Sequence, residues 1–137
     1  MKETYMLDTD TCSYIMREHP KHIIIKLQEY VEKKHRIVIS AITYSELRFG
    51  AIGKKASSKH NIIVDEFMSR IDEVLPWHKK AVETTALIKK DLNDLGTQIG
   101  DNDTMIAGHA IADDCVLITN NEKHFKRVQH LNYTNWV

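Results

Sequence analysis

The sequence contains few of the residues on which several classes of protein depend. It has only two cysteines, and Cys12 and Cys115 lie far apart without the spacing of a metal knuckle, so we expect two free, buried thiols in a reducing cytosol. The eight histidines show no ligand pattern, because His19 and His22 have no second pair with which to complete a zinc site. Lysine plus arginine equal aspartate plus glutamate at 19 each, so the net charge does not indicate nucleic-acid binding.

Long hydrophobic runs are also missing. No apolar run approaches the length of a membrane span, and the first residues lack the pattern of a secretory signal peptide. The chain has no P-loop, no G-x-G-x-x-G motif, and no spacing typical of a Ser-His-Asp or Cys-His catalytic group. A hydrophobic content of 42% with 28% charged residues is ordinary for a globular chain. We therefore expect one cytoplasmic domain over residues 1–137, with no membrane segment.

The chain does contain a regular alternation of short apolar runs and helical patterns. The runs are rich in aliphatic residues, as in strands buried on both faces, and they cover residues 5–7, 37–39, 74–75 and 116–119. The tail from 131 to 137 can add an edge strand. Strands that alternate with helices predict an α/β fold of three layers, in which helices cover both faces of a central, mostly parallel sheet of four or five strands.

Polar residues and glycines predict where several helices begin and end. Ser40 or Thr43 is a candidate N-cap for the helix after the second strand, and Gly50 is expected to end that helix. Residues 52–60 then have the composition of an exposed connection. Residues 101–103 supply cap residues for a helix that runs to residue 112.

Acidic residues fall where this fold would bring them together. Asp8 ends the first strand, and Glu46 lies in the helix after the second strand. Asp103 opens a later helix, and Asn121 follows the fourth strand. In a parallel sheet these positions share one rim, in the crevice where open α/β folds bind ligands. Converging carboxylates need a cation, and oxygen ligands suit Mg²⁺ or Mn²⁺, which can activate a water for phosphodiester cleavage.

Each of these residues also has a purely structural interpretation. Thr43 and Glu46 match a capping box, in which Glu46 only secures the start of a helix. Asp101 or Asp103 can be a simple N-cap, and Asn121 can belong to a turn. For any one residue the structural interpretation is the more common. Their joint position at one edge of the sheet favours a functional site.

The same segments resemble the PIN-domain nucleases, and most closely the VapC toxins of bacterial type II toxin–antitoxin pairs. The resemblance extends over nearly the whole chain in the right order. It rests on YMLDT at 5–9, the stretch from Ile39-Ser40 through Glu46 to Gly50-Ala51, IGDNDTMIAGHA at 99–110, LITNN at 117–121, HFKRV at 124–128 and Trp136.

The resemblance implies a PIN-like three-layer fold and a metal-dependent active site. Asp8 and Asp103 would hold Mg²⁺, with Mn²⁺ as an alternative, and Glu46 would complete the acidic site and help to position the attacking water. The position of Asn121 is often acidic in PIN domains, so Asn121 would orient a water or phosphate, and Glu122 or Asp101 could restore the missing charge. The auxiliary residues expected around this site are Asp101, Asn121, Thr9 and Thr119.

The resemblance also implies an activity and partners. The chain would be an endoribonuclease toxin that cleaves structured RNA, with initiator tRNA a plausible target, and so arrests translation and growth. A VapB-type antitoxin would neutralise it, and a homodimer would be its usual assembly. Basic residues near the acidic rim are expected to contact RNA phosphates; they are Lys54, Lys55, Lys123 and Arg127.

Two other functions remain open at this stage. Asp8-Thr9-Asp10-Thr11 also fits the D-x-D-x-T signature of haloacid-dehalogenase-type phosphatases, in which Asp8 would be the nucleophile. Against this, the second acidic motif at 100–103 should follow an apolar strand, yet Gly96-Thr97-Gln98 precedes it. A PIN-like scaffold without catalytic activity could instead serve as a binding module. That alternative is disfavoured because Asp8, Glu46 and Asp103 are all present.

Overall fold

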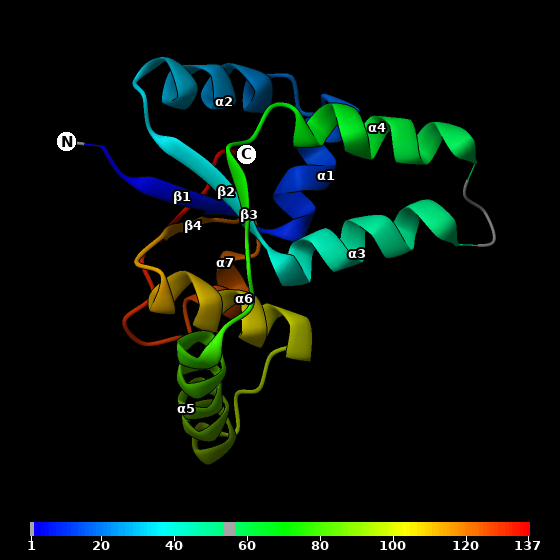
Figure 1. Cartoon of the computed structure of the whole chain (residues 1–137). Helices are drawn as coiled ribbons and strands as arrows, with labels where there is room; N and C mark the ends of the chain where they lie inside the picture. Colours follow the sequence, from blue (N-terminus) through cyan, green and yellow to red (C-terminus); the bar gives the residue numbers. More distant parts are fainter. Residues whose placement is uncertain (1, 54–56) are drawn as a thin grey trace.

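A five-stranded parallel sheet forms the centre of the molecule, as expected (Figure 1). The structure is a computed structural model that describes residues 2–53 and 57–137. Within these residues the strands follow the spatial order β3-β2-β1-β4-β5, and every neighbouring pair is parallel; they are β1 (Thr4–Leu7), β2 (Arg36–Ser40), β3 (Glu73–Leu75), β4 (Val116–Ile118) and β5 (Tyr133–Thr134). The first strand is therefore the central one, and its end lies between the ends of β2 and β4.

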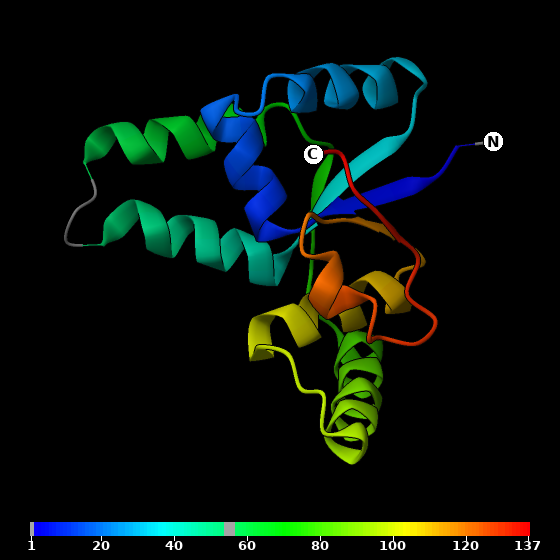
Figure 2. The same cartoon turned by 180° about the vertical axis from the view of Figure 1, so that it is seen from behind.

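Helices cover both faces of this sheet, which gives three layers (Figures 1 and 2). Side chains alternate across each strand, so Met6 packs with the helices of one layer and Leu7 with those of the other. The first layer contains α5 (Lys79–Leu95), α6 (Asp101–Ala112) and α7 (Glu122–Phe125). The second contains α1 (Thr9–Arg17), α2 (His22–Glu32), α3 (Ala41–Ile52) and α4 (Ser58–Met68). Cys12 and Cys115 are buried free thiols, as expected.

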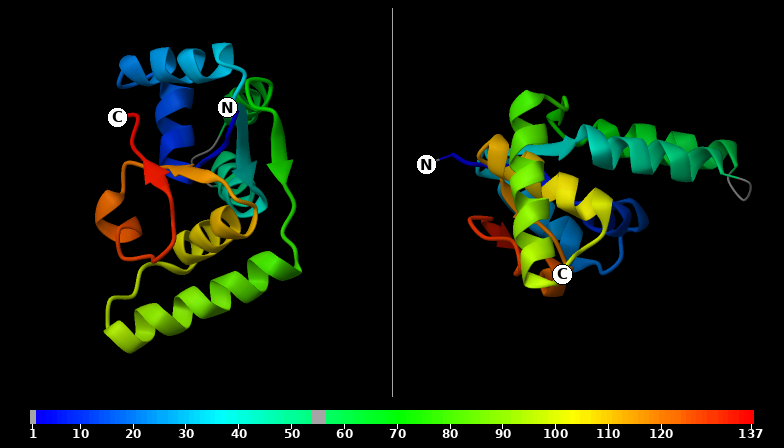
Figure 3. Two further views of the ribbon diagram at one scale, coloured as in Figure 1. Left: turned by 90° about the vertical axis from the view of Figure 1, so that its left-hand side faces the viewer. Right: turned by 90° about the horizontal axis from the view of Figure 1, so that it is seen from below.

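Helices α3 and α4 lie side by side and extend away from the sheet (Figure 3). The expectation that Gly50 ends the first of them is wrong, because the helix continues to Ile52 and Gly53 caps it. Its buried face continues past Gly50: Leu47 and Ala51 are both buried, four residues apart. The expected connection over 52–60 is correspondingly shorter, since α4 already begins at Ser58.

No helix among the residues that the structure describes is both long enough and apolar enough to cross a lipid bilayer.

The contact between α5 and α6 requires a glycine at position 108. A Cβ atom added to Gly108 would lie 2.1 Å from Thr85 Oγ1 and 3.0 Å from its Cα atom. We expect Gly108→Ala to lower the free energy of unfolding by about 1–3 kcal/mol, although alanine favours helices more than glycine does. Urea denaturation measures this change. Gly50→Ala is the matched control, because a Cβ atom added to Gly50 would meet no neighbouring atom within 4 Å, and it should be neutral or stabilising. Equal effects of the two substitutions would contradict the packing argument.

Candidate active site

Asp8 lies at the centre of the sheet rim, where β1 ends and α1 begins. It is the N-cap of α1, and its Oδ1 accepts a hydrogen bond from the backbone N–H of Thr11 at 2.8 Å. Its own N–H donates to the carbonyl of Ile118 at 3.0 Å, which fixes it beside β4. Only 3% of Asp8 is exposed. The central strand thus delivers a carboxylate that is almost wholly removed from solvent.

Burial dominates the electrostatics of this carboxylate. Desolvation raises the pKa of Asp8 to about 6, and the charge of Asp10 adds to the rise, whereas hydrogen bonds from Thr119 and Thr11 oppose it. No ion pair between described residues involves Asp8. A buried carboxylate without a cationic partner is unfavourable, and a bound divalent ion would relieve it. The surroundings of Asp8 therefore fit a metal ligand.

Glu46 extends from α3 toward the start of α1. The hydroxyl of Thr9 donates to Glu46 Oε1 at 2.6 Å, and the Thr43 hydroxyl lies 3.3 Å from that of Thr9. The capping-box interpretation does not hold, because Ser40 is the N-cap of α3 and accepts a hydrogen bond from Ile42 N–H at 3.0 Å. The side chain of Glu46 is therefore directed to the residue that follows Asp8 rather than to its own helix start.

Asp103 approaches from the other helical layer. It lies in the first turn of α6, whose N-cap is Gly100, so the helix begins before Asp103 and neither Asp101 nor Asp103 caps it. Partial burial raises the pKa of Asp103, the charges of Asp10 and Glu46 raise it further, and His124 lowers it. The Nδ1 atom of His124 is 3.6 Å from Asp103 Oδ2. Asp103 therefore lies within electrostatic range of Glu46, which is 57 positions earlier in the sequence.

The carboxylates share this region without forming a closed ligand shell. Among the described residues, the group of three whose ligand atoms lie close enough to hold an ion does not include Asp8, Glu46 or Asp103. Asp8 follows β1, whereas Glu46 lies on α3 and Asp103 on α6, which belong to opposite helical layers. A divalent ion that keeps several of its waters, as Mg²⁺ does, suits such an open arrangement of oxygen ligands.

The auxiliary residues separate into two groups. Thr119 is buried, accepts a hydrogen bond from Asn121 N–H at 2.9 Å, and bonds to Asp8, so it connects the ends of β1 and β4. The amide nitrogen of Asn121 lies 2.9 Å from His124 Nδ1. Asp101 is different: its side chain is 82% exposed and lies 3.7 Å from Lys89 Nζ on α5. The structure does not bring Asp101 to Asp8.

Two of the four basic residues expected to contact RNA phosphates lie within the part of the chain that the structure describes. Lys54 and Lys55 lie outside the described residues. Lys123 is exposed on α7, close in sequence to His124. The Arg127 guanidinium donates to the carbonyl of Gln98 at 3.3 Å, so this side chain supports the loop before α6.

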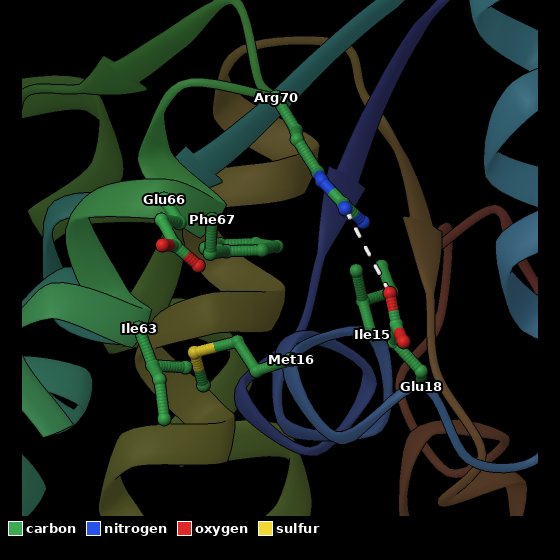
Figure 4. A pocket seen from close by; sticks show the side chains of 7 residues that line it. All are labelled: Ile15, Met16, Glu18, Ile63, Glu66, Phe67 and Arg70. Atoms are coloured by element: carbon green, nitrogen blue, oxygen red, sulfur yellow. Dashed lines mark ion pairs between the residues drawn. The ribbon is translucent and has the colours of Figure 1, made fainter. Parts of the chain in front are cut away.

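A groove leads away from the acids along the second helical layer. It has a volume of about 520 Å³, and Thr9, Asp10 and Glu46 line its end at the rim. A cavity of about 240 Å³ between α1 and α4 shares Met16 and Ile63 with it. Figure 4 shows this cavity, which is closed on one side by the ion pair of Arg70 with Glu18 at 3.8 Å. An extended ligand at the acidic rim therefore has a partly apolar path along α1.

Sequence reasoning missed two histidine arrangements. His124 was noted only as part of the HFKRV stretch and was given no role at the site, but it contacts Asp103; its spacing of three residues from Asn121 was the available signal. We also expected no ligand cluster among the histidines, yet the fold brings together His78, His109 and Asp113. The spacing of the last two was visible in the sequence, whereas the approach of His78 depends on how α5 packs against α6.

The phosphatase interpretation finds no support in this geometry. Its second acidic motif should follow a buried strand, but residues 97–100 are a loop and Asp101 begins α6. Glu46, which has no role in that scheme, is instead hydrogen-bonded beside Asp8.

Comparisons with known proteins agree on one family. The PIN domain model matches residues 5–131. Ribonuclease VapC2 of Rickettsia felis is 37% identical over 132 residues, which cover 96% of this chain and 97% of that protein. The tRNA(fMet)-specific endonuclease VapC of Salmonella typhimurium is 36% identical over 132 residues, with the same coverage. The structure of VapBC2 from Rickettsia felis bound to a promoter DNA fragment contains a chain that superposes with a TM-score of 0.90 at 35% identity, covering 98% of this chain and 99% of that one.

Proposed function

Because this chain belongs to the PIN domain family and, within it, to the VapC ribonucleases, we propose that it is an endoribonuclease that requires a divalent metal ion. The observation that carries the proposal is the buried carboxylate of Asp8 at the end of the central strand, which forms no ion pair with a described residue, with Glu46 and Asp103 approaching from opposite layers. The alternative of a catalytically inactive binding module has no comparable support, because all three of these carboxylates are present.

The side chains have distinct roles in the proposed reaction. Asp8 and Asp103 would hold Mg²⁺ or Mn²⁺, because they are the carboxylates whose pKa values burial raises. The ion would supply charge stabilisation and a water of lowered pKa. Glu46 orients the attacking water, and the short hydrogen bond from Thr9 fixes its carboxylate in place. Thr119 holds Asp8 through its hydroxyl, and Asn121 positions His124 beside Asp103.

The proposed substrate is structured RNA, and the proposed partner is an antitoxin. The name of the Salmonella relative supports tRNA(fMet) as the target, and the VapBC complexes support a VapB-type antitoxin. We place the protein in the cytoplasm, as one PIN domain that assembles as a homodimer. A chain of zero net charge with an acidic site needs local cations near the RNA backbone, and Lys123 on α7 is suitably exposed.

Expression in bacteria tests this function. We expect the wild type to arrest growth and to produce discrete new RNA 5′ ends when total RNA is sequenced. Asp8→Asn and Asp103→Asn should produce neither. Asp94→Asn is the matched control, because Asp94 is exposed on α5 and its one ion pair among the described residues is with Lys90, and it should act as the wild type does. Growth arrest and identical RNA ends from all four proteins would refute the assignment.

A further inference from the structure

A second group of ligand atoms contains none of the acids at the rim. His78, His109 and Asp113 each offer one ligand atom, and these atoms all lie within 4.8 Å of one another. His78 is the N-cap of α5, just after β3, whereas His109 and Asp113 lie four residues apart on one face at the end of α6. The Asp113 carboxylate is between the two rings: Oδ1 is 2.8 Å from His78 Nε2, and Oδ2 is 3.0 Å from His109 Nε2.

The two nitrogens of the buried His109 ring have different surroundings. The ring is 0% exposed, and its Nδ1 lies 2.7 Å from Ser40 Oγ at the end of β2. Its Nε2 lies 3.0 Å from Asp113 Oδ2, but among the described residues this contact does not have the alignment of a good hydrogen bond. Buried polar atoms in folded proteins are nearly always paired. A buried nitrogen that faces a carboxylate and a second imidazole without a well-aligned hydrogen bond is placed as a metal ligand would be.

We propose that His78, His109 and Asp113 bind a divalent transition-metal ion of the Zn²⁺ class, at a site separate from the acidic rim. Two imidazole nitrogens and one carboxylate oxygen are typical zinc ligands, whereas Mg²⁺ and Mn²⁺ prefer oxygen. The contact of His109 Nδ1 with Ser40 is the kind that a ligating histidine makes through its second nitrogen. Zinc bonds of about 2.0–2.2 Å place two ligand atoms at most about 4.4 Å apart, and the ligand atoms of this group lie within 4.8 Å of one another, so the partly exposed His78 side chain has only a small distance to move.

The position of this site suggests what the ion does. It joins the start of α5 to the end of α6, two helices that contact and cross each other (Figure 3). Asp103 lies on the same helix, six residues before His109, or about 9 Å along the helix axis. The ion would fix α6 against β2 and β3 and so hold Asp103 at the rim. Three protein ligands leave a fourth position for water.

Cobalt binding tests this site in the full chain. Metal-free protein is titrated with Co²⁺ in excess Mg²⁺, which occupies the oxygen-rich site. We expect one equivalent of Co²⁺ to give the visible absorption of a four-coordinate ion, and one equivalent of Zn²⁺ to remove it. The Trp77 ring lies 5.4 Å from that of His109, so Co²⁺ should also quench tryptophan fluorescence.

Substitutions of the two partly exposed ligands identify the site. His78→Gln and Asp113→Asn should weaken Co²⁺ binding by at least about 100-fold, since losing only an outer-shell partner already costs about 10–100-fold. His22→Gln, an exposed histidine on α2, and Asp8→Asn should both retain the wild-type spectrum. Circular dichroism confirms that each variant is folded. The proposal is overturned if the wild type gives no stoichiometric spectrum, or if His78→Gln and Asp113→Asn bind Co²⁺ as tightly as the wild type.

Discussion

Asp103→Asn is expected to reduce the rate of RNA cleavage by about 10²–10³-fold while the protein remains folded. The substitution keeps the size of the side chain but removes a charge that would stabilise a bound cation and the developing charge of the reaction. The carboxylate is partly buried beside His124 and within range of Glu46, so its replacement changes the site directly. Single-turnover cleavage of a defined RNA at saturating Mg²⁺ measures the effect.

Asp101→Asn is the control that makes this result specific. Asp101 lies two residues away in the same helical turn, but its side chain is 82% exposed and approaches Lys89. We expect its substitution to leave the cleavage rate within a few fold of the wild type. If Asp101→Asn were as damaging as Asp103→Asn, then Asp101 would supply the charge that is missing at Asn121. Unchanged cleavage by Asp103→Asn would remove Asp103 from the site.

Asp8→Asn is expected to stabilise the metal-free protein. Folding raises the pKa of Asp8 from 3.8 to about 6, so the folded state disfavours the charged form. The protonated Asp8 side chain therefore contributes to the free energy of unfolding below about pH 4, and this contribution is lost as the pH rises through about 6. A pKa difference of about two corresponds to about 3 kcal/mol. Asparagine does not ionise, so it does not lose this stability at high pH, and as an N-cap it can still accept a hydrogen bond from the Thr11 N–H. Urea unfolding in EDTA at pH 7.5 should therefore show Asp8→Asn as the more stable protein.

The difference in stability between the wild type and Asp8→Asn should depend on both pH and Mg²⁺. At pH 4 in EDTA the difference in the free energy of unfolding should nearly vanish. At pH 7.5 an excess of Mg²⁺ should stabilise the wild type and have little effect on Asp8→Asn, because a ligand that binds only the folded state stabilises it. Equal stability of the two proteins in EDTA at both pH values would show that burial does not penalise the charged form of Asp8.

The sheet and the acidic rim were predictable because they depend on strand ends. Apolar runs at 5–7 and 116–119 predicted buried parallel strands, and parallel strands bring their carboxyl ends to one edge. Helix boundaries were less predictable. Gly50 reads as a stop signal, but the buried Ala51 keeps the helix packed, and the helix continues for two more residues to Ile52. Similarly, Gly100 rather than an aspartate is the N-cap of α6.

Individual side-chain partners could not be predicted, because they depend on packing between distant elements. The hydrogen bond between Thr9 and Glu46 joins residues 37 positions apart, and the sequence suggested the nearer Thr43 as the partner of Glu46. His78 meets Asp113 only because α5 and α6 pack against each other. Local spacing determines which face of a helix a residue occupies, but it does not determine what that face meets.

A crystal structure of the Mn²⁺-loaded protein, with anomalous scattering recorded for manganese, tests the central claim most directly. The account predicts an anomalous peak at the carboxyl end of β1, with carboxylate oxygens of Asp8 and Asp103 about 2.0–2.2 Å from the ion and Glu46 within reach of one of its waters. Manganese bound only elsewhere, with Asp8 uncoordinated in an otherwise unchanged fold, would contradict it.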